Sequence, residues 1–239
     1  MAEKSDNTDT DPDTDTDTDT DIDIDTVVLD VDGTLVDTVY QHTVLWAKAF
    51  AAVGVDVPMW RLHRAIGMGG DRLVAEVAGD DVEKEHGDAV REKHDRSFDE
   101  VIDEVRPLPG AADLLDELRR RGLKVVLASS GIGAQTERLL ALVGGEEKSH
   151  GWTSSDDVDS SKPAPDLLEV AMGKVDAAHA LMVGDAVWDV SAAQNAGLPS
   201  VGLRCGGFSA AELRDAGAAQ VFTDPADLLE HLDEALRPG

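Results

Sequence analysis

The stretch Val27-Val28-Leu29-Asp30-Val31-Asp32-Gly33-Thr34 decides the fold. Its apolar, β-branched run is typical of a buried strand, and two carboxylates one residue apart follow at its end. Because side chains alternate along an extended chain, Asp30 and Asp32 point to the same side. Gly33 permits a sharp turn directly after them. The sequence therefore predicts a strand that leads into a polar site.

Downstream, short apolar runs alternate with helical patterns. Strands are expected at residues 124–128, 180–183, 200–203 and 220–222. Helices are expected between and after them, at residues 111–121, 134–143, 166–172, 187–196, 209–216 and 225–236. This alternation is typical of an α/β protein with a doubly wound parallel sheet and right-handed crossovers.

The segment between the first two predicted strands has a different pattern. It contains helical stretches at residues 39–53, 60–66, 71–78 and 82–102, no convincing strand, and the flexible loop Gly67-Met68-Gly69-Gly70. Pro107-Leu108-Pro109-Gly110 marks its end. We therefore expect a Rossmann-like core formed by residues 25–36 and 107–239, with a helical cap domain at residues 37–106 inserted into it.

The chain is strongly acidic, with a formal net charge of -28. Residues 1–24 are rich in Asp and Thr and offer no apolar face, so a disordered acidic tail is expected there. The remainder is also acidic, and an acidic, aromatic-poor composition favours a halophilic, cytoplasmic protein. Nucleic-acid and membrane binding are not expected, because such a surface repels phosphates and anionic lipids. A monomer and a homodimer both remain open.

Polar residues follow several of the predicted strands, namely Asp30 and Asp32, Ser129, and Asp185 with Asp189 one helical turn later. In open parallel sheets, ligands bind beyond the carboxyl ends of the strands. Four clustered aspartates would repel one another unless a cation were bound, and hard oxygen ligands favour Mg²⁺. Lys162 is a candidate for the positive charge that such a site needs. No dinucleotide fingerprint or Walker loop is present.

Four sequence elements, taken in order, resemble the motifs of the haloacid dehalogenase superfamily, in its phosphatase and phosphomutase-like branch. The elements are Asp30-Val31-Asp32-Gly33-Thr34, the strand-end Ser129, Lys162-Pro163, and Gly184-Asp185 with Asp189. The resemblance spans residues 26 to about 236. It implies an α-helical cap inserted after the first core strand.

The resemblance implies a role for each of these residues. Asp30 would be the nucleophile that forms an aspartyl phosphate, and Asp32 the acid and base for the leaving oxygen and for water. Ser129 and the backbone amides of Ser130 and Gly131 would hold phosphoryl oxygens, together with Lys162. The metal ligands would be Asp30, the Asp32 backbone carbonyl, Asp185, and Asp189 either directly or through another group.

Substrate selection is expected in the cap. His42 is a candidate for contact with the leaving group, although a structural histidine is the alternative. Gly69, Gly70 and Arg72 form the loop that would approach the substrate, and Arg64 competes with Arg72 for an anion.

Several reactions remain to be distinguished. The second acid, Asp32, favours phosphate-ester hydrolysis over dehalogenation, and no lysine of the phosphonatase type lies near residues 67–72. We therefore expect a Mg²⁺-dependent phosphatase that acts on a small phosphorylated metabolite, either phosphoglycolate-like or a sugar phosphate. The alternatives are a β-phosphoglucomutase-like mutase and a catalytically idle binding or regulatory protein of the same fold.

Overall fold

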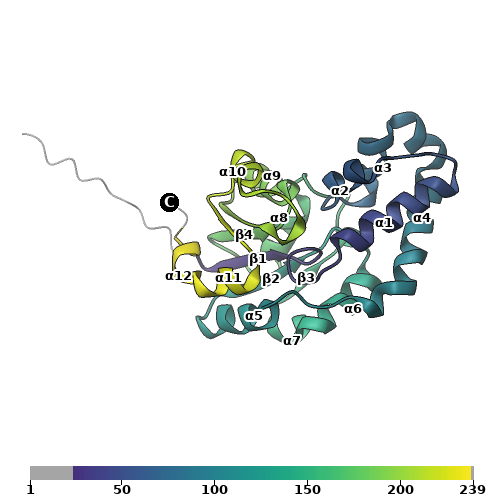
Figure 1. Ribbon diagram of the computed structural model, residues 1–239. Helices are drawn as coiled ribbons and strands as arrows, with labels where there is room; N and C mark the ends of the chain where they lie inside the picture. Colours follow the sequence, from purple (N-terminus) through teal and green to yellow (C-terminus); the bar gives the residue numbers. More distant parts are fainter. Residues whose placement is uncertain (1–23, 238–239) are drawn as a thin grey trace, which may run out of the picture.

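The computed structural model describes residues 24–237. The acidic tail expected at residues 1–24 therefore lies, apart from Ile24, outside the described residues. Figure 1 shows a central sheet with helices on both sides and a separate group of helices at one end.

The sheet has six parallel strands in the order β3-β2-β1-β4-β5-β6. The strands are β1 (Thr26–Asp30), β2 (Lys124–Ala128), β3 (Trp152–Thr153), β4 (Ala180–Gly184), β5 (Ser200–Leu203) and β6 (Gln220–Phe222). The first strand lies between β2 and β4, so all of its residues are buried. This central place explains the continuous apolar run before Asp30, since both faces of the strand are covered.

Helices cover the two faces of the sheet, which confirms the doubly wound α/β fold. Val27 and Leu29 join one hydrophobic cluster, whereas Val28 joins another on the opposite face, as the strand period of two requires. The first cluster includes α5 (Ala111–Arg120), α6 (Gly133–Val143), α11 (Pro225–Glu230) and α12 (Leu232–Ala235). The second includes α8 (Asp166–Gly173) and α9 (Val187–Asn195). Helices α7 (Gly145–Lys148) and α10 (Ala210–Asp215) complete the core.

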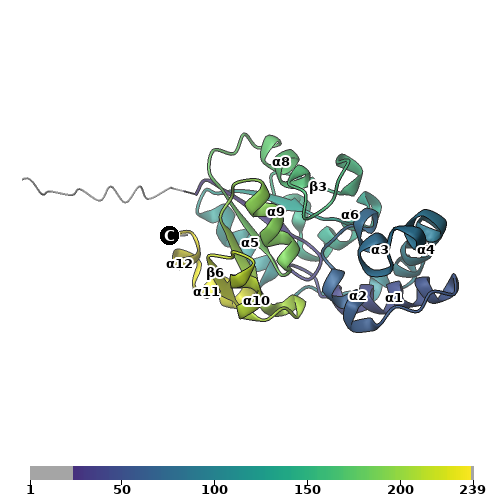
Figure 2. The same ribbon diagram turned by 90° about the horizontal axis from the view of Figure 1, so that it is seen from above.

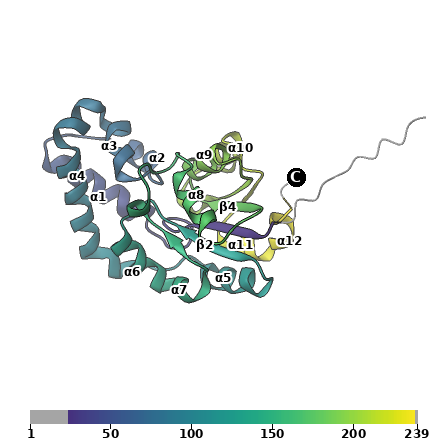
Figure 3. The same cartoon turned by 180° about the vertical axis from the view of Figure 1, so that it is seen from behind.

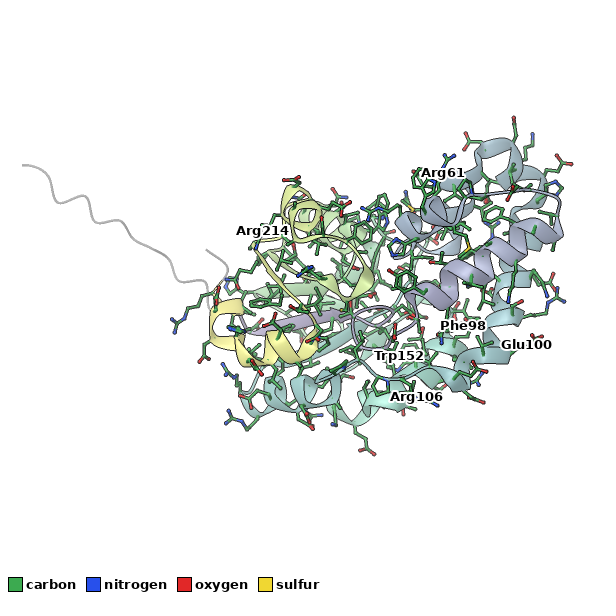
Figure 4. All side chains as sticks on the ribbon, viewed as in Figure 1. Arg61, Phe98, Glu100, Arg106, Trp152 and Arg214 are labelled. Atoms are coloured by element: carbon green, nitrogen blue, oxygen red, sulfur yellow. The ribbon has the colours of Figure 1, made fainter. Side chains whose placement is uncertain are left out.

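Four helices form the group inserted after β1, namely α1 (Val39–Ala52), α2 (Met59–Ala65), α3 (Gly70–Ala78) and α4 (Asp80–Val101). They have a hydrophobic cluster of their own, centred on Trp46, Phe50 and Leu62. Figures 2 and 3, seen from above and from behind, place this group beyond one end of the sheet. Phe98 on α4 joins the core cluster, and Figure 4 shows it on the core side while Glu100 points outward. The residues assigned to the cap therefore pack directly onto the core.

Three local features differ from the pattern expected from sequence, and one of them is the short helix α7, which no expected helix covers. The last expected helix is two helices, because His231 between them has a non-helical backbone (φ -114°, ψ 23°). The edge strand β3 was not expected, because two residues are too few to show a strand period. Short 3₁₀ turns occur at Ile102–Glu104, Ser155–Asp157 and Arg204–Gly206.

Candidate active site

The site begins at the carboxyl end of β1, where the chain turns sharply at Gly33. This residue has φ +83°, and a Cβ atom there would lie 2.5 Å from Asp185 Oδ2. The turn is held by backbone hydrogen bonds from Gly33 N–H to Val36 O (2.8 Å) and from Leu35 N–H to Val31 O (2.9 Å). Only glycine fits this turn, which brings the end of β1 against the end of β4.

Three buried carboxylates meet at these strand ends. One oxygen each from Asp30, Asp185 and Asp189 lies within 4.8 Å of the others. The Lys162 ammonium, which has no exposed surface, bonds Asp30 and lies 2.7 Å from Asp189 Oδ1. Three carboxylates around one ammonium leave the site with an excess of negative charge.

The pKa values of the cluster reflect that excess. Burial raises the pKa of Asp30 to about 7, and the charges of Asp189 and Asp32 add to this against the opposing effect of Lys162. Burial, with Asp189 and Asp30 nearby, also raises the pKa of Asp185 well above its ordinary value. A second cation would relieve this repulsion, and a set of carboxylate oxygens suits a hard divalent ion. The cluster therefore fits Mg²⁺.

Two of the three carboxylates are oriented by further hydrogen bonds. Asp185 Oδ1 accepts a bond from the Thr34 hydroxyl (2.7 Å), and Asp189 Oδ2 accepts one from the Ala186 N–H (2.9 Å). Because Asp189 Oδ1 faces Lys162, both oxygens of Asp189 have protein partners. This geometry favours Asp189 as the residue that fixes Lys162.

Asp32 has a different environment from Asp30. Its Oδ1 contacts the Thr38 hydroxyl (2.9 Å) and His42 Nε2 (3.2 Å), and its Oδ2 accepts a bond from Ser129 Oγ (3.0 Å). Burial alone would raise the pKa of Asp32, but the bonds from His42, Thr38 and Ser129 hold it below the ordinary value. The pKa values of the two acids after β1 are thus shifted in opposite directions, which is common where two carboxylates have different roles.

A chain of hydrogen bonds leads from Asp32 into α4. His42 Nδ1 lies 3.1 Å from His94 Nε2, and His94 Nδ1 lies 2.9 Å from Asp95 Oδ1. If the Asp95 carboxylate accepts from His94 Nδ1–H, neutral His94 offers Nε2 as an acceptor to His42 Nδ1–H. His42 Nε2 then faces Asp32 Oδ1. The ring of His94 also stacks on Trp46, with centroids 4.0 Å apart.

The loop after β2 supplies the other polar groups of the site. Ser129 Oγ accepts a bond from the Gly131 N–H (3.0 Å), and the Ser130 hydroxyl donates to Gly67 O in the inserted segment (3.3 Å). Ser130 and Gly131 line the cavity described next, whereas Ser129 is fully buried and does not line it.

A cavity of about 230 Å³ lies between the inserted helices and the core. Asp30 and Asp32 are on its core side, and His42 and Gly70 are on its helical side. The structure thus brings together most of the residues proposed from sequence. The remaining lining residues are Trp46, Ile66, Gly67, Met68, Asp71, Arg91, His94, Asp95, Ser130, Gly131, Ile132, Gln135, Ser155, Val158, Asp159 and Ser161.

Three residues proposed for substrate selection do not line this cavity. Arg72 donates to Ser160 Oγ (3.1 Å) and borders a separate groove. Arg64 pairs with Glu212 and lies 3.8 Å from the centre of the Phe208 ring. The Gly69 N–H donates to Ser161 Oγ (2.9 Å), so this backbone joins the loop to the core.

Sequence reasoning did not identify Arg91, His94 or Asp95. All three lie in α4, a long polar helix whose charged residues give no sign of which side faces a cavity. His94 is only 5% exposed, which is unusual in such a polar segment. Their position in the cavity wall follows from the packing of α4 against α1.

Within residues 24–237, the structure contains no helix that combines the length and apolar character needed to cross a bilayer.

Comparison with known proteins identifies the family. A model for haloacid dehalogenase-like hydrolases matches residues 24–197, and a HAD-hydrolase-like model matches residues 160–235. A hydrolase from Pseudomonas syringae is 37% identical and superposes with a TM-score of 0.83, covering 87% of this chain and 98% of that one.

Two curated relatives have named activities. Phosphonoacetaldehyde hydrolase of Bordetella pertussis is 31% identical over 77% of this chain and 74% of its own length. Phosphoglycolate phosphatase of Rhodobacter capsulatus is 27% identical over 73% of this chain and 82% of its own. The matched models, the six-stranded parallel sheet and the aspartate cluster agree, and the chain belongs to the haloacid dehalogenase-like hydrolases.

Proposed function

We propose that this protein is a Mg²⁺-dependent phosphatase that hydrolyses a small phosphomonoester through an aspartyl phosphate on Asp30. The observation that carries the proposal is the position of Asp30 and Asp32 in one cavity, above the buried cluster of Lys162, Asp185 and Asp189. Phosphoglycolate-like acids and sugar phosphates are the two substrate classes that the sequence favours.

In the first step, a carboxylate oxygen of Asp30 attacks phosphorus while the bond from phosphorus to the leaving oxygen breaks. Asp32 gives a proton to that oxygen, so that an alcohol leaves. In the second step, Asp32 takes a proton from water, which attacks phosphorus, releases phosphate and restores Asp30. Donors at Ser129, Ser130 and Gly131 would hold the phosphoryl oxygens.

The other residues of the site would bind the metal ion and orient the nucleophile. Mg²⁺ would be bound by Asp30, the Asp32 backbone carbonyl and Asp185. Asp189 is the third carboxylate of the buried cluster. The ion would supply positive charge against the phosphoryl oxygens. Lys162, fixed between Asp30 and Asp189, keeps the nucleophile oriented and adds further positive charge.

Two related reactions are less well supported. A phosphonatase of the Schiff-base type needs a lysine in the cap that faces the substrate, and no lysine is among the described residues that line the cavity. A phosphomutase remains the alternative, since it would use the same Asp30 and Asp32. Incubation with β-glucose 1-phosphate and its bisphosphate separates the two: glucose 6-phosphate accumulates with a mutase, and free phosphate with a phosphatase.

The direct test is hydrolysis of p-nitrophenyl phosphate with Mg²⁺ in molar salt, which suits the acidic composition. We expect turnover by the wild type and its loss in Asp30→Asn. Asp113→Asn, an exposed change on α5, is the matched control and should retain activity. A folded wild type no faster than Asp30→Asn would overturn the proposal.

The role of Asp32 as the acid for the leaving oxygen can be tested separately. Nitrophenolate is a stable anion that leaves without protonation, whereas an alkoxide requires an acid. Asp32→Asn should therefore lose more activity toward an alkyl phosphate than toward p-nitrophenyl phosphate. Equal losses on both substrates would contradict a role for Asp32 as the acid.

A further inference from the structure

The cavity wall beyond the reacting groups carries an excess of negative charge. Asp71, Asp95 and Asp159 line it together with one guanidinium, that of Arg91. Lys162 lies below the cavity, bonded to Asp30, and Arg72 borders the separate groove. A substrate held here meets three carboxylates in addition to the catalytic pair.

Arg91 is already engaged by its own helix and by the first residue of α3. Its Nη1 donates to Glu83 Oε2 (2.9 Å) and to Gly70 O (3.0 Å), and its Nη2 donates to Asp88 Oδ1 (2.8 Å). Two carboxylates thus balance one guanidinium, and three of its five N–H donors are occupied. An anionic group on a substrate would have to compete with Glu83 and Asp88 for the charge of Arg91.

The three carboxylates have few cationic partners. Asp95 accepts a bond from His94, whose burial lowers its pKa to about 4, so this partner is neutral at pH 7. Asp71 accepts a bond from the Ser161 N–H (3.1 Å) and lies 3.9 Å from Arg72 Nε, at the outer limit of an ion pair. Within residues 24–237, Asp159 has no ion-pair partner.

The rest of the lining sets the size and character of the group that fits. The volume of about 230 Å³ suits a small metabolite. Apolar side chains contribute to the wall, among them Trp46, Ile66 and Met68, and they suit the carbon skeleton of such a molecule. Carboxylate oxygens accept hydrogen bonds and do not donate them, so they pair with hydroxyl or ammonium groups.

From the carboxylate lining and the engaged guanidinium, we infer that the preferred substrate carries no negative charge besides its phosphoryl group, and that its leaving group bears a hydroxyl or an amine. This inference rests on the proposed phosphatase function. The expected substrates are polyol, sugar or amino-alcohol phosphates. Phosphoglycolate is disfavoured, although a relative of this chain is named for that substrate.

Three two-carbon esters of matched size test the inference: 2-hydroxyethyl phosphate, phosphoethanolamine and 2-phosphoglycolate. The kcat/KM of each is measured with Mg²⁺ at one salt concentration, together with its inhibition constant against p-nitrophenyl phosphate. We expect the hydroxyl and amine esters to exceed the carboxylate ester at least tenfold in kcat/KM, or in affinity where an ester is not turned over. Equal or better performance of 2-phosphoglycolate would overturn the inference.

A double variant removes the intrinsic reactivity of the esters from the comparison. Asp71→Asn with Asp159→Asn keeps side-chain size and removes two charges. The ratio of 2-phosphoglycolate to 2-hydroxyethyl phosphate should rise severalfold, and this ratio does not depend on the fraction of folded protein. The control Asp81→Asn, at the start of α4 and outside the cavity, should leave the ratio unchanged. An unchanged ratio in the double variant would contradict the inference.

Failure of the phosphatase proposal and failure of the substrate inference give different results. If the folded protein hydrolyses neither p-nitrophenyl phosphate nor any of the three esters, the phosphatase proposal fails and the substrate inference fails with it. If p-nitrophenyl phosphate is hydrolysed and 2-phosphoglycolate is the best ester, only the substrate inference fails.

Discussion

His94 provides a prediction about stability that is independent of catalysis. Burial lowers the pKa of this histidine from 6.5 to about 4, with a further contribution from His42 and against the opposing bond to Asp95. Between these two pH values, the unfolded chain binds a proton at His94 that the native protein does not bind. Stability is therefore lost as the pH falls below 6.5, and the loss is complete near pH 4. The difference corresponds to about 3 kcal/mol of folding free energy.

The assay compares the wild type with His94→Gln, which cannot titrate and offers an oxygen near the position of Nε2. Urea unfolding at fixed molar salt gives the free energy of unfolding at several pH values from 7.5 to 4. We expect the wild type to lose about 3 kcal/mol more than the variant over this range. Titration of the many carboxylates is common to both proteins and cancels in the comparison.

A matched control lies on the same helix. His86 is about a third exposed, so His86→Gln should follow the pH dependence of the wild type. Parallel curves for the wild type and His94→Gln would refute the reasoning, because they would show that burial does not suppress protonation of His94.

Three further predictions concern the core of the site. Lys162→Met should lower the free energy of unfolding by about 3–5 kcal/mol in urea, because two buried carboxylates lose their cation, whereas the exposed Lys84→Met should change it by less than about 0.5 kcal/mol. Free Mg²⁺ at ten times its Kd should stabilise the wild type by about 1.4 kcal/mol, and Asp185→Asn should largely abolish this effect; equal stabilisation of both proteins would argue against the metal site. Burial raises the pKa of the Cys205 thiol, and its Sγ donates to Gly33 O (3.1 Å). A disulfide reagent at pH 8 should therefore modify the native protein at least about 10 times more slowly than the urea-unfolded protein.

The parallel core was predictable because its signals are local. A buried central strand is apolar on both faces, so its position was visible in the run before Asp30. The order of strand ends also placed Ser129 and Asp185 beside Asp30 and Asp32, since parallel strands finish at the same edge. The helices of the inserted segment were expected within a few residues of their observed bounds, because helical spacing and the glycines between the helices are local signals.

The environment of each acid was not predictable in the same way. Asp30 and Asp32 are two residues apart, yet burial raises the pKa of one while hydrogen bonds lower that of the other. Those bonds come from Thr38, His42 and Ser129, and the last is 97 residues away in the chain. Such long-range partners are set by packing.

The sequence by itself determined the α/β fold and the residues that make the site reactive, because strand period and residue chemistry are local properties. The tertiary structure decided which groups face the substrate. Arg72 was a reasonable candidate from its loop, but packing turns it to Ser160 and brings Arg91 and Asp95 into the cavity instead. The orientation of α4 against α1 and the core governs this choice, and its polar sequence does not encode that orientation in a readable pattern.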